Sequence, residues 1–525
     1  MDDNRLTNLA YNQKYTISEF NSNSNKLISN ELTDGNYGTT DFHDTAWSIF
    51  KGGITRSVVF DFESCKSIWK INANFLEDGK NEIEFPHTVS FYASLAGTRW
   101  STLTHAATKY RPFTNNSPRV QTYCWCAQTN QIPLGDNIQF ICARYIMVTF
   151  KTNGLIYADQ IEVLGSDGIE RDAIKLLPDS YDYLESGDKT DNIENLVLLY
   201  NGWYENNLGD WTKDKLIPYI SYVNAEKQPQ SWFFDSVLYL ALWSPWNRSF
   251  EGQDKPSNLD DWKWYLNKQF KIHGDLEELN ESVKEVSAKL NDPEYRLKVL
   301  MMIPYPSSLQ SNFGYLDGED NLMNFDNHIV GDKQALNNRK HAVKWYISQV
   351  LEHWNASQYS HLQLSGLYWL HEWLEYDVPF EAELVQYAGQ ITHDHSLKYY
   401  WIPFFNANRD FSWRQLGFDA AILQPNHFFY ETEKSRIQDC AQLAKQYGMG
   451  IEIEFDEQIN SDPEYFKKFI NYLNGGVDFK YMNKVFKGYY QGNTTLLESA
   501  YSMFKDIREN YDRIYRFVKG IYEKE

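Results

Sequence analysis

A chain of 525 residues is too long for one ordinary domain, so two or three domains are expected. Its formal net charge of −21 argues against partners that need basic patches, namely nucleic acid and anionic membrane surfaces. Hydrophobic residues make up 42% of the chain, enough for substantial cores, but no segment reaches the ~18 consecutive apolar residues of a membrane span.

The unusual feature of the composition is an aromatic content of 16%, with 17 Trp and 37 Tyr. Trp and Tyr combine a flat apolar face with a polar edge, which suits stacking on sugar rings as well as packing in cores. The five cysteines show no zinc-site spacing and leave disulfide pairing open. The first residues lack the apolar core of a signal peptide, and we expect that an export signal has been removed.

The first third of the chain, residues 1–165, shows short strand-like runs separated by turns. Because helical periods are missing between them, the pattern predicts an antiparallel β-sandwich. The strands are expected at residues 57–62, 67–71, 88–94, 143–150 and 159–164.

The same third resembles the discoidin-like modules (coagulation factor type C, galactose-binding-like jelly rolls). The resemblance rests on these segments, in the family's order: Leu32-Thr33-Asp34-Gly35, Arg56 to Phe62, Val89 to Ser94, Ala143 to Val148 and Ala158 to Val163. It implies a carbohydrate-binding module and a structural Ca²⁺, for which Asp34 and Glu162 are the matching oxygen ligands. A cap on the turn before Gly35 is an equally good explanation of Asp34.

A polar, turn-rich segment at residues 166–194 is interpreted as a linker, and strands then alternate with helices through residues 195–525. Helical segments include residues 337–354 and 431–447. Eight apolar strand-like runs are expected at residues 196–200, 237–243, 298–304, 364–370, 399–405, 418–423, 449–455 and 483–490. Alternation repeated eight times predicts a (β/α)8 TIM barrel.

The seventh of these runs has an acidic face. Apolar and acidic residues alternate in it, so a strand places Glu452, Glu454 and Asp456 on one side. Three carboxylates on an apolar strand repel one another and resist burial, so folding gains nothing obvious from them. A barrel strand that ends at a ligand site accounts for these residues. A solvated edge strand is the alternative.

Aromatic and polar side chains gather at the expected carboxyl ends of the strands, which meet at one rim of a barrel. Stacking faces, amides and charged groups that bond hydroxyls are together typical of a carbohydrate cleft. The candidate substrate-binding residues are Trp203, Trp243, Trp246, Arg248, Tyr305, Trp369, His371, Asn406, Asn408, Asn426, His427, Asp456 and Tyr489.

Glycosidic hydrolysis needs two carboxyl groups: one protonates the leaving oxygen, and the other attacks the anomeric carbon or activates water. Glu372 after the fourth strand and Glu454 on the seventh form the best pair. The arrangement is similar to the largest clan of retaining glycoside hydrolases, which implies Glu372 as acid/base and Glu454 as nucleophile. That clan usually has Asn before the first of these glutamates, whereas this chain has His371, which weakens the transfer of mechanism.

The barrel region also resembles an uncharacterised bacterial family, a domain of unknown function often found behind discoidin-like modules in secreted or cell-surface proteins. The resemblance is carried by Trp203-Tyr204, Tyr305-Pro306, Leu367 to Trp369 and Gln424 to Asn426. It implies a bacterial protein that is secreted or at the cell surface, and it supplies no chemistry.

We therefore expect a two-domain enzyme that binds a poly- or oligosaccharide and hydrolyses its glycosidic bonds without a catalytic cofactor. One alternative is a catalytically inactive glycan-binding or adhesion protein. Another is a polysaccharide lyase, in which Tyr305 would be the base and Arg248 or Arg409 would neutralise a uronate carboxylate. The sequence leaves the sugar, its linkage and the choice between endo and exo action open.

Overall fold

The computed structural model describes residues 6–19, 26–28, 30–110, 117–128, 140–252, 255–316, 321–430, 432 and 434–525. The chain forms two compact units. Unit 1 runs to Tyr181 and includes the short segments Glu375–Asp377 and Asn406–Phe411. Unit 2 contains the remaining residues from Asp182 to Glu525.

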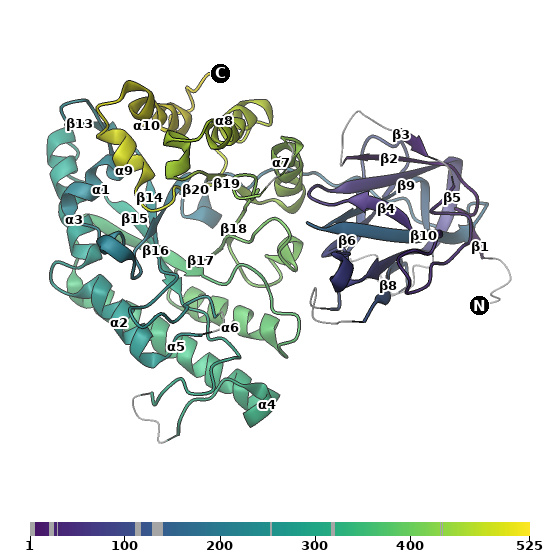
Figure 1. The fold of residues 1–525 in the computed structure, drawn as a ribbon, viewed down its shortest axis with the longest axis horizontal. Coiled ribbons are helices and arrows are strands. Elements are labelled where there is room, and N and C mark those ends of the chain that lie inside the picture. The colour runs from purple at the N-terminus through teal and green to yellow at the C-terminus, as the bar shows by residue number, and fades with distance from the viewer. Residues whose placement is uncertain are drawn as a thin grey trace. The chain divides into compact units, whose positions relative to one another are not determined.

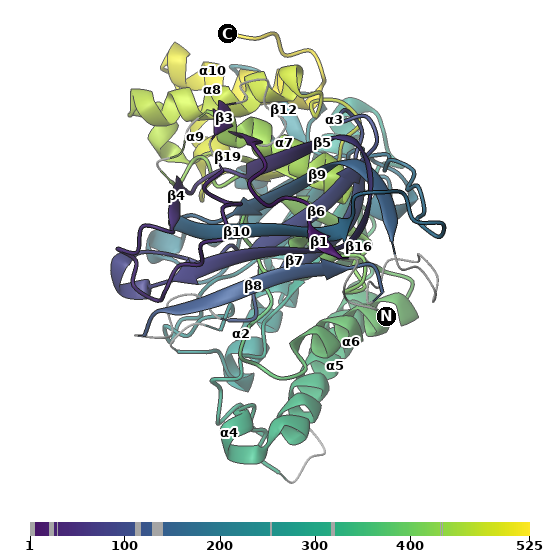
Figure 2. The ribbon, with the colours of Figure 1, turned by 90° about the vertical axis from the view of Figure 1, so that its right-hand side faces the viewer.

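Unit 1 is built on antiparallel strands that pair in the order β1-β10-β5-β9-β6-β7, while β2, β4 and β8 pair beside this path. Figure 2 looks onto these strands. Their bounds are β1 Thr7–Asn8, β2 Tyr15–Glu19, β3 Lys26–Ile28, β4 Ser48–Lys51, β5 Arg56–Glu77, β6 Thr88–Ser94, β7 Ser101–Ala107, β8 Arg119–Cys126, β9 Ile141–Lys151 and β10 Leu155–Ser166. The antiparallel β architecture predicted for the first third of the chain is confirmed.

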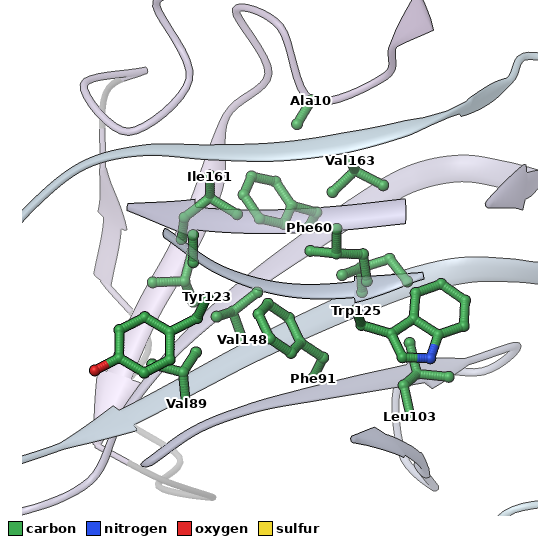
Figure 3. Close-up of a cluster of buried hydrophobic side chains, with 14 of the residues drawn as sticks. Ala10, Phe60, Val89, Phe91, Leu103, Tyr123, Trp125, Val148, Ile161 and Val163 are labelled. Atoms are coloured by element: carbon green, nitrogen blue, oxygen red, sulfur yellow. The ribbon is translucent and has the colours of Figure 1, made fainter. Parts of the chain in front are cut away.

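The core of unit 1 consists of apolar side chains that point inward from these strands (Figure 3). Phe60 of β5, Phe91 of β6 and Val148 of β9 have no exposed surface. In β8 the buried Tyr123 and Trp125 alternate with more exposed neighbours, as expected for a strand with one face on the core. Burial of these large side chains is the main stabilising contribution to the unit.

Two of the predicted strands are one strand in the structure. Residues 57–62 and 67–71 both belong to β5, whose pairing with β9 shifts register between Asp61 and Lys66. Glu63 adopts a positive φ of 61° there, so the polar interruption is a bulge within a strand rather than a turn between strands. Strands β7 and β8 are absent from the predicted set because polar Ser, Thr and Gln residues interrupt their apolar pattern.

The predicted linker at residues 166–194 is divided between the two units. In unit 1 the backbone N–H of Cys142 donates to the carbonyl oxygen of Ile174 at 2.7 Å. In unit 2 the backbone N–H of Leu184 donates to the carbonyl oxygen of Met449 at 3.0 Å. Each part of the segment is therefore packed on its own unit.

Unit 2 contains a closed barrel of parallel strands in the order β11-β14-β15-β16-β17-β18-β19-β20 (Figure 1). The barrel closes because β20 pairs with β11 as well as with β19. The strands are β11 Asn195–Tyr200, β14 Ser236–Leu240, β15 Leu297–Ile303, β16 Leu362–Trp369, β17 Lys398–Trp401, β18 Ala420–Leu423, β19 Gly450–Glu454 and β20 Lys487–Tyr490. Each overlaps the run predicted for it, so the predicted eight-stranded barrel is confirmed. A separate hairpin pairs β12 Ser221–Val223 with β13 Pro229–Trp232.

Helices lie outside the barrel strands in Figure 1. They are α1 Lys213–Ile220, α2 Leu259–Phe270, α3 Asp275–Leu290, α4 Asn327–Val330, α5 Asp332–Ser357, α6 Glu381–Asp394, α7 Ser435–Tyr447, α8 Pro463–Asp478, α9 Thr495–Ala500 and α10 Lys505–Val518. The connection between β17 and β18, described throughout, contains only the 3-10 helix Asp410–Ser412, so strict (β/α)8 alternation is wrong at this step. Its Asn and Asp residues favour turns over helix.

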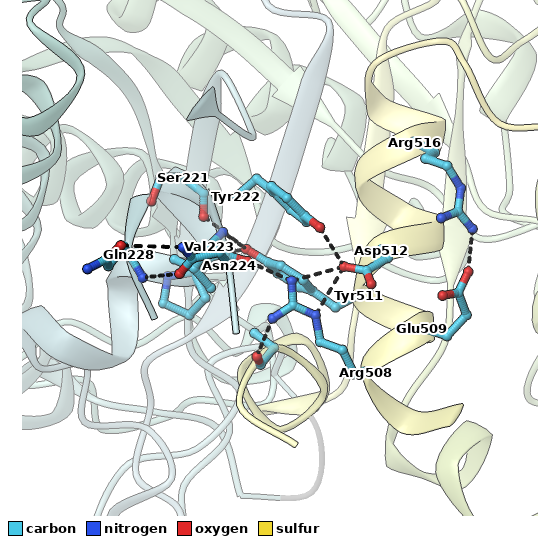
Figure 4. A network of polar contacts seen from close by, with 12 residues as sticks. Ser221, Tyr222, Val223, Asn224, Gln228, Arg508, Glu509, Tyr511, Asp512 and Arg516 are labelled. Carbon is cyan, nitrogen blue, oxygen red and sulfur yellow. Dashed lines mark hydrogen bonds and ion pairs between the residues drawn. The ribbon is translucent and has the colours of Figure 1, made fainter. Parts of the chain in front are cut away.

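Helix α10 is held to the rest of unit 2 by Arg508 (Figure 4). The Nη2 group of Arg508 donates to the carbonyl oxygen of Val223 at 2.6 Å and to Oδ1 of Asp512 at 3.0 Å. The hydroxyl of Tyr222 donates to the same carboxylate oxygen at 2.9 Å. Strand β12 and helix α10 are thus joined by one network of hydrogen bonds.

Candidate active site

Glu454 is the last residue of β19 and is completely buried. Its Oε1 accepts hydrogen bonds from the backbone N–H of Asn426 at 3.1 Å and from the Asn426 side-chain amide at 3.3 Å. Asn426 follows β18 with a left-handed φ of 51°, a conformation that Asn tolerates better than most residues. The carboxylate is therefore bound by two donors from the neighbouring strand end.

The other carboxylate oxygen of Glu454, Oε2, accepts a hydrogen bond from the hydroxyl of Tyr472 on α8. That hydroxyl oxygen itself accepts the backbone N–H groups of His427 at 3.0 Å and Phe428 at 3.2 Å. Since both lone pairs of the hydroxyl are occupied, its hydrogen points to Glu454. Tyr472 is thus fixed as a donor to this carboxylate.

The pKa of Glu454 reflects two opposing effects. Burial is the larger effect, so the pKa is raised on balance to about 7. The hydrogen bonds from Tyr472 and Asn426 and the positive charge of Arg436 lower the pKa, because they stabilise the ionised carboxylate.

Glu372 follows β16 by three residues and is half-buried. Its pKa is raised to about 8, mainly by burial and also by the negative charges of Glu251 and Glu454, while a hydrogen bond with the Gln424 side chain opposes the rise. Glu372 therefore keeps its proton to a higher pH than Glu454.

The amides at the end of β18 connect the two glutamates. Gln424, which forms the hydrogen bond with Glu372, accepts the side-chain amide of Asn426 on its Oε1 at 3.0 Å. Asn426 in turn donates to Glu454. Gln424 Nε2 is also bound to the carbonyl oxygen of Ile402 at 2.9 Å, which fixes the amide between the two acids. The structure thus brings together the two carboxyl groups that the sequence predicts as a pair.

Two further carboxyl groups act on this pair. Glu452, one pleat below Glu454 on β19, is buried, and burial and the charges of Glu454 and Glu372 raise its pKa well above the usual range. It lies opposite Gly488 of β20, where a side chain would contact the Glu452 carboxylate. Burial likewise raises the pKa of Glu251, which sequence reasoning does not select because it lies in a loop without a motif.

Three tyrosines accompany the carboxyl groups, and sequence reasoning selects none of them. Burial raises the pKa of Tyr200, Tyr368 and Tyr490, and the nearby glutamates add to the shift in each case. The rings of Tyr200 and Tyr490 meet edge to face, with centroids 5.6 Å apart. Only Tyr490 of β20 is in register with Glu454, so the predicted Tyr489 is one residue off.

Tyr489 points away from the carboxyl groups. Its hydroxyl donates to Oδ1 of Asn195, the first residue of β11, at 2.8 Å, and its ring packs on Phe234. Because side chains alternate along a strand, an error of one position moves the side chain to the other face. The prediction of Tyr489 as a substrate-binding residue is therefore corrected.

Of the predicted aromatic binders, Trp203 and Trp246 are 48% and 52% exposed, while Trp243 is half-buried. Trp369 and Tyr305 are buried and pack edge to face, 6.0 Å apart. These last two therefore belong to the core of the barrel.

His371 is buried and stacks on Tyr305 at 3.8 Å with an interplanar angle of 8°. Its Nδ1 donates to the carbonyl oxygen of Glu251 at 3.0 Å, so the ring positions the loop that carries this acid. The Tyr305 hydroxyl accepts a hydrogen bond from Arg339 at 3.0 Å. Arg248 bonds the buried Asp261 at 2.5 Å. Neither Tyr305 nor Arg248 is thus arranged as the lyase alternative requires.

His427 and Asp456 are engaged by their own surroundings. The ring nitrogens of His427 contact Thr432 at 2.6 Å and Asn471 at 3.2 Å, and burial lowers its pKa to about 4. Asp456 accepts the backbone N–H of Gln458 at 2.9 Å and caps a short 3-10 helix. Both residues have structural partners beside the site.

Asn406 and Asn408 lie in the segment that belongs to unit 1, and both are buried. The Asn406 amide donates to Asn153 at 2.7 Å. Their predicted position on the barrel rim is therefore corrected, because this connection packs in the other unit.

The predicted calcium ligands accept hydrogen bonds from protein groups. Asp34 accepts from the backbone of Asn36 and from Gln160 at 2.8 Å each, and Glu162 accepts from Asn72 at 2.8 Å. Across the described residues no three His, Cys, Asp or Glu side chains are grouped as a metal would need. The predicted calcium site stays a prediction.

All five cysteines lie in the described part of the chain, and each is a free thiol. No helix within the described ranges has the length and apolar character needed to cross a membrane.

Three solved structures are similar to about a third of the chain. CpGH89CBM32-6 produced by Clostridium perfringens shares 18% identity over 30% of this chain and 98% of its own, with a TM-score of 0.19. The chitosan-binding module 1 of a chitosanase/glucanase from Paenibacillus sp. IK-5 shares 15% identity over 30% and 98%, with a TM-score of 0.19. The C-terminal domain of a chitobiase from Bacteroides fragilis shares 15% identity over 32% and 97%, with a TM-score of 0.19.

No protein with a curated description matches the chain. One family profile matches residues 195–516, which is more than half of the 525 residues and spans the whole barrel. The chain therefore belongs to the family described as Domain of unknown function (DUF4855).

Proposed function

We propose that the barrel hydrolyses glycosidic bonds by a retaining mechanism, with Glu372 as acid/base and Glu454 as nucleophile, and that unit 1 binds glycan. The observation that carries the proposal is the unequal environment of the two carboxyl groups. Glu454 is bound by three donors that favour its charged form, whereas Glu372 has one such partner and lies under the influence of two negative charges. Groups whose surroundings separate their pKa values are typical of an acid and base pair.

In the first step the proton of Glu372 passes to the leaving oxygen as the bond from that oxygen to the anomeric carbon breaks. Glu454 forms a bond to the same carbon and becomes an ester. Water then attacks this carbon, gives one proton to Glu372 and releases Glu454 as carboxylate. One water is consumed for each bond broken, and both residues return to their starting protonation.

Glu251 helps Glu372 to act as the acid. The negative charge of Glu251 disfavours ionisation of Glu372, so Glu372 holds the proton that the first step needs. Tyr472 and Asn426 hold the nucleophile in one orientation. A polysaccharide is met outside the cell, and on this proposal the protein acts there or at the cell surface.

The test uses aryl glycosides of common hexoses, hexosamines and pentoses, which require little acid assistance. With whichever glycoside the wild type cleaves, Glu454→Gln is expected to lose at least 10³-fold in rate, and Glu372→Gln should lose far less. A 2-deoxy-2-fluoro glycoside of that sugar should label the peptide that contains Glu454, as read by mass spectrometry. The exposed Glu226→Gln is the control and should leave the rate unchanged.

The stereochemical outcome is a second test. Retention, followed by proton NMR of the first-formed anomer, is expected for carboxyl groups about 5–5.5 Å apart. Inversion would mean that Glu454 acts as a base that activates water rather than as the nucleophile. Labelling of a residue other than Glu454, or normal rates in Glu454→Gln, would remove the assignment altogether.

A further inference from the structure

Beyond the carboxyl groups, the barrel presents a second set of exposed aromatic side chains. The sequence Phe428-Phe429-Tyr430 follows β18, the strand that supplies Gln424 and Asn426. Phe428 is completely buried, but Phe429 is 43% exposed and Tyr430 is 55% exposed. Single exposed apolar side chains are common on protein surfaces, so the position of these two rings beside the carboxyl groups carries the argument rather than their exposure alone.

Phe429 is one ring away from the proposed nucleophile. Its ring meets that of Tyr490 at 79° with centroids 5.2 Å apart. Tyr490 is the register partner of Glu454 on the adjacent strand, and the charge of Glu454 acts on its hydroxyl. A sugar stacked on Phe429 would therefore neighbour a sugar bound at the carboxyl groups.

The segment that carries Phe429 is anchored on both sides. The Nζ group of Lys468 on α8 donates to the carbonyl oxygen of Phe428 at 3.1 Å and to that of Tyr430 at 3.0 Å. Burial of Phe428 against Tyr465 of the same helix fixes the segment further. The exposed rings are thus presented by a backbone that is already held in place, which reduces the entropy lost on binding.

Exposed aromatic rings also follow β11 and β14, the two strands that come after β20 in the order of the barrel. Trp203 follows β11, which pairs with β20, and Trp246 follows β14, which pairs with β11. The loop of Trp246 is fixed by the ion pair of Arg248 with Asp261 on α2. The backbone N–H of Trp203 donates to the carbonyl oxygen of Trp243 at 3.0 Å.

We propose that Phe429 and Tyr430 on one side, and Trp203 and Trp246 on the other, are stacking platforms for sugars that flank the bond to be cleaved. The barrel then takes an extended glycan and cuts internal bonds. The glycan is uncharged or cationic, because the net charge of −21 repels polyanions. This inference rests on the proposed hydrolase function for the cleavage and on the aromatic side chains alone for the binding.

Binding is tested separately from cleavage, in the full-length chain with Glu454→Gln. Native gels containing hydroxyethylcellulose, laminarin, pectic galactan, xylan or chitosan measure affinity by retardation, and heparin serves as the polyanion. With a polymer that retards this protein, adding Phe429→Ala or Trp246→Ala is expected to weaken binding about fivefold or more. Phe504→Ala, which removes a ring that is 71% exposed at the start of α10, is the matched control and should have no effect.

Cleavage is tested with the otherwise wild-type chain on the same polymer. Internal cleavage lowers viscosity well before reducing ends accumulate. Internal cleavage should persist in Phe429→Ala with a raised KM for the polymer, whereas Phe504→Ala should leave both that KM and the rate on a short aryl glycoside unchanged. Three outcomes would overturn the proposal: equal retardation of the platform variants and their parent, no retardation by any uncharged polymer or by chitosan, and tighter binding to heparin than to these polymers. If retardation depends on Phe429 but the wild-type chain forms no cleavage product, the proposed hydrolase function is overturned and the proposed stacking platforms are still supported.

Discussion

The hydroxyl of Tyr472 donates a hydrogen bond to Glu454, while two backbone N–H groups occupy the lone pairs of that hydroxyl. Tyr472 is therefore oriented so that it acts on this carboxyl group as a donor. The donor supports the ionised form, against the burial that supports the neutral one.

Replacing Tyr472 with Phe is expected to raise the pKa of Glu454, because a donor to its charged form is lost. A charge-assisted hydrogen bond of about 1.5–3 kcal/mol corresponds to roughly one to two pKa units. On the proposed mechanism Glu454 must be ionised to act as the nucleophile, so the acid limb of the pH–rate profile should move to higher pH. Tyr489→Phe removes another buried hydroxyl, bonded to Asn195, and should leave the profile in place. An unmoved acid limb in Tyr472→Phe would contradict the assignment.

Replacing Glu251 with Gln should act on the opposite limb. The negative charge of Glu251 raises the pKa of Glu372, so its removal lowers that pKa below about 8. The acid then loses its proton at lower pH, and the basic limb of the pH–rate profile is expected to move down by about half a unit to one unit. Glu205→Gln, a change at an exposed position after β11, provides the comparison. A basic limb that stays in place or moves to higher pH would show that the charge of Glu251 does not raise the pKa of Glu372.

The buried carboxyl groups should make stability depend on pH. Glu372, Glu452 and Glu454 all have raised pKa values, so the folded chain holds protons that the unfolded chain releases near the ordinary value of 4.5. The stabilisation is fully present below that value and is lost as the pH rises through about 7 to 8, at about 1.4 kcal/mol per pH unit for each proton held. The Tm should therefore fall between pH 5 and pH 8.5.

Glu452→Gln isolates this effect, since the amide keeps the shape of the side chain without the charge. Thermal unfolding of this variant should show a smaller fall of Tm across the same range and a higher Tm than the wild type at pH 8. Glu226→Gln, at an exposed position, should reproduce the wild-type curve. A wild-type Tm that rises from pH 5 to pH 8.5 would mean that other groups dominate the linkage.

Arg508→Ala should destabilise unit 2 by about 2–4 kcal/mol, since Asp512 and the carbonyl oxygen of Val223 each lose a charged donor (Figure 4). Arg516→Ala is the matched control, because its ion pair with Glu509 on the same helix is about one third exposed and should matter by under 1 kcal/mol. Denaturant unfolding compares the two. Equal losses would show that the helix, rather than the Arg508 network, carries the stability.

Local patterns in the chain predict much of this architecture. Apolar runs of four to eight residues mark each barrel strand, and period-two alternation on β19 marks Glu452 and Glu454 as sharing a face. The prediction of a helix after every strand is wrong after β17. The connection there contains turn-forming residues, and part of it packs in unit 1. The prediction of two separate strands within β5 is also wrong, because the polar residues of a bulge resemble those of a turn in sequence.

The sequence by itself determined the fold class of each unit and the pair of glutamates, since the strand-like runs predict the barrel and both glutamates lie at the carboxyl ends of such runs. Only the tertiary structure decided which groups surround that pair. Tyr472 reaches Glu454 from a helix eighteen residues further on, and Glu251 acts on Glu372 from a loop more than a hundred residues earlier. Electrostatic and hydrogen-bonding effects depend on distance in space, and no periodicity in the chain records that distance.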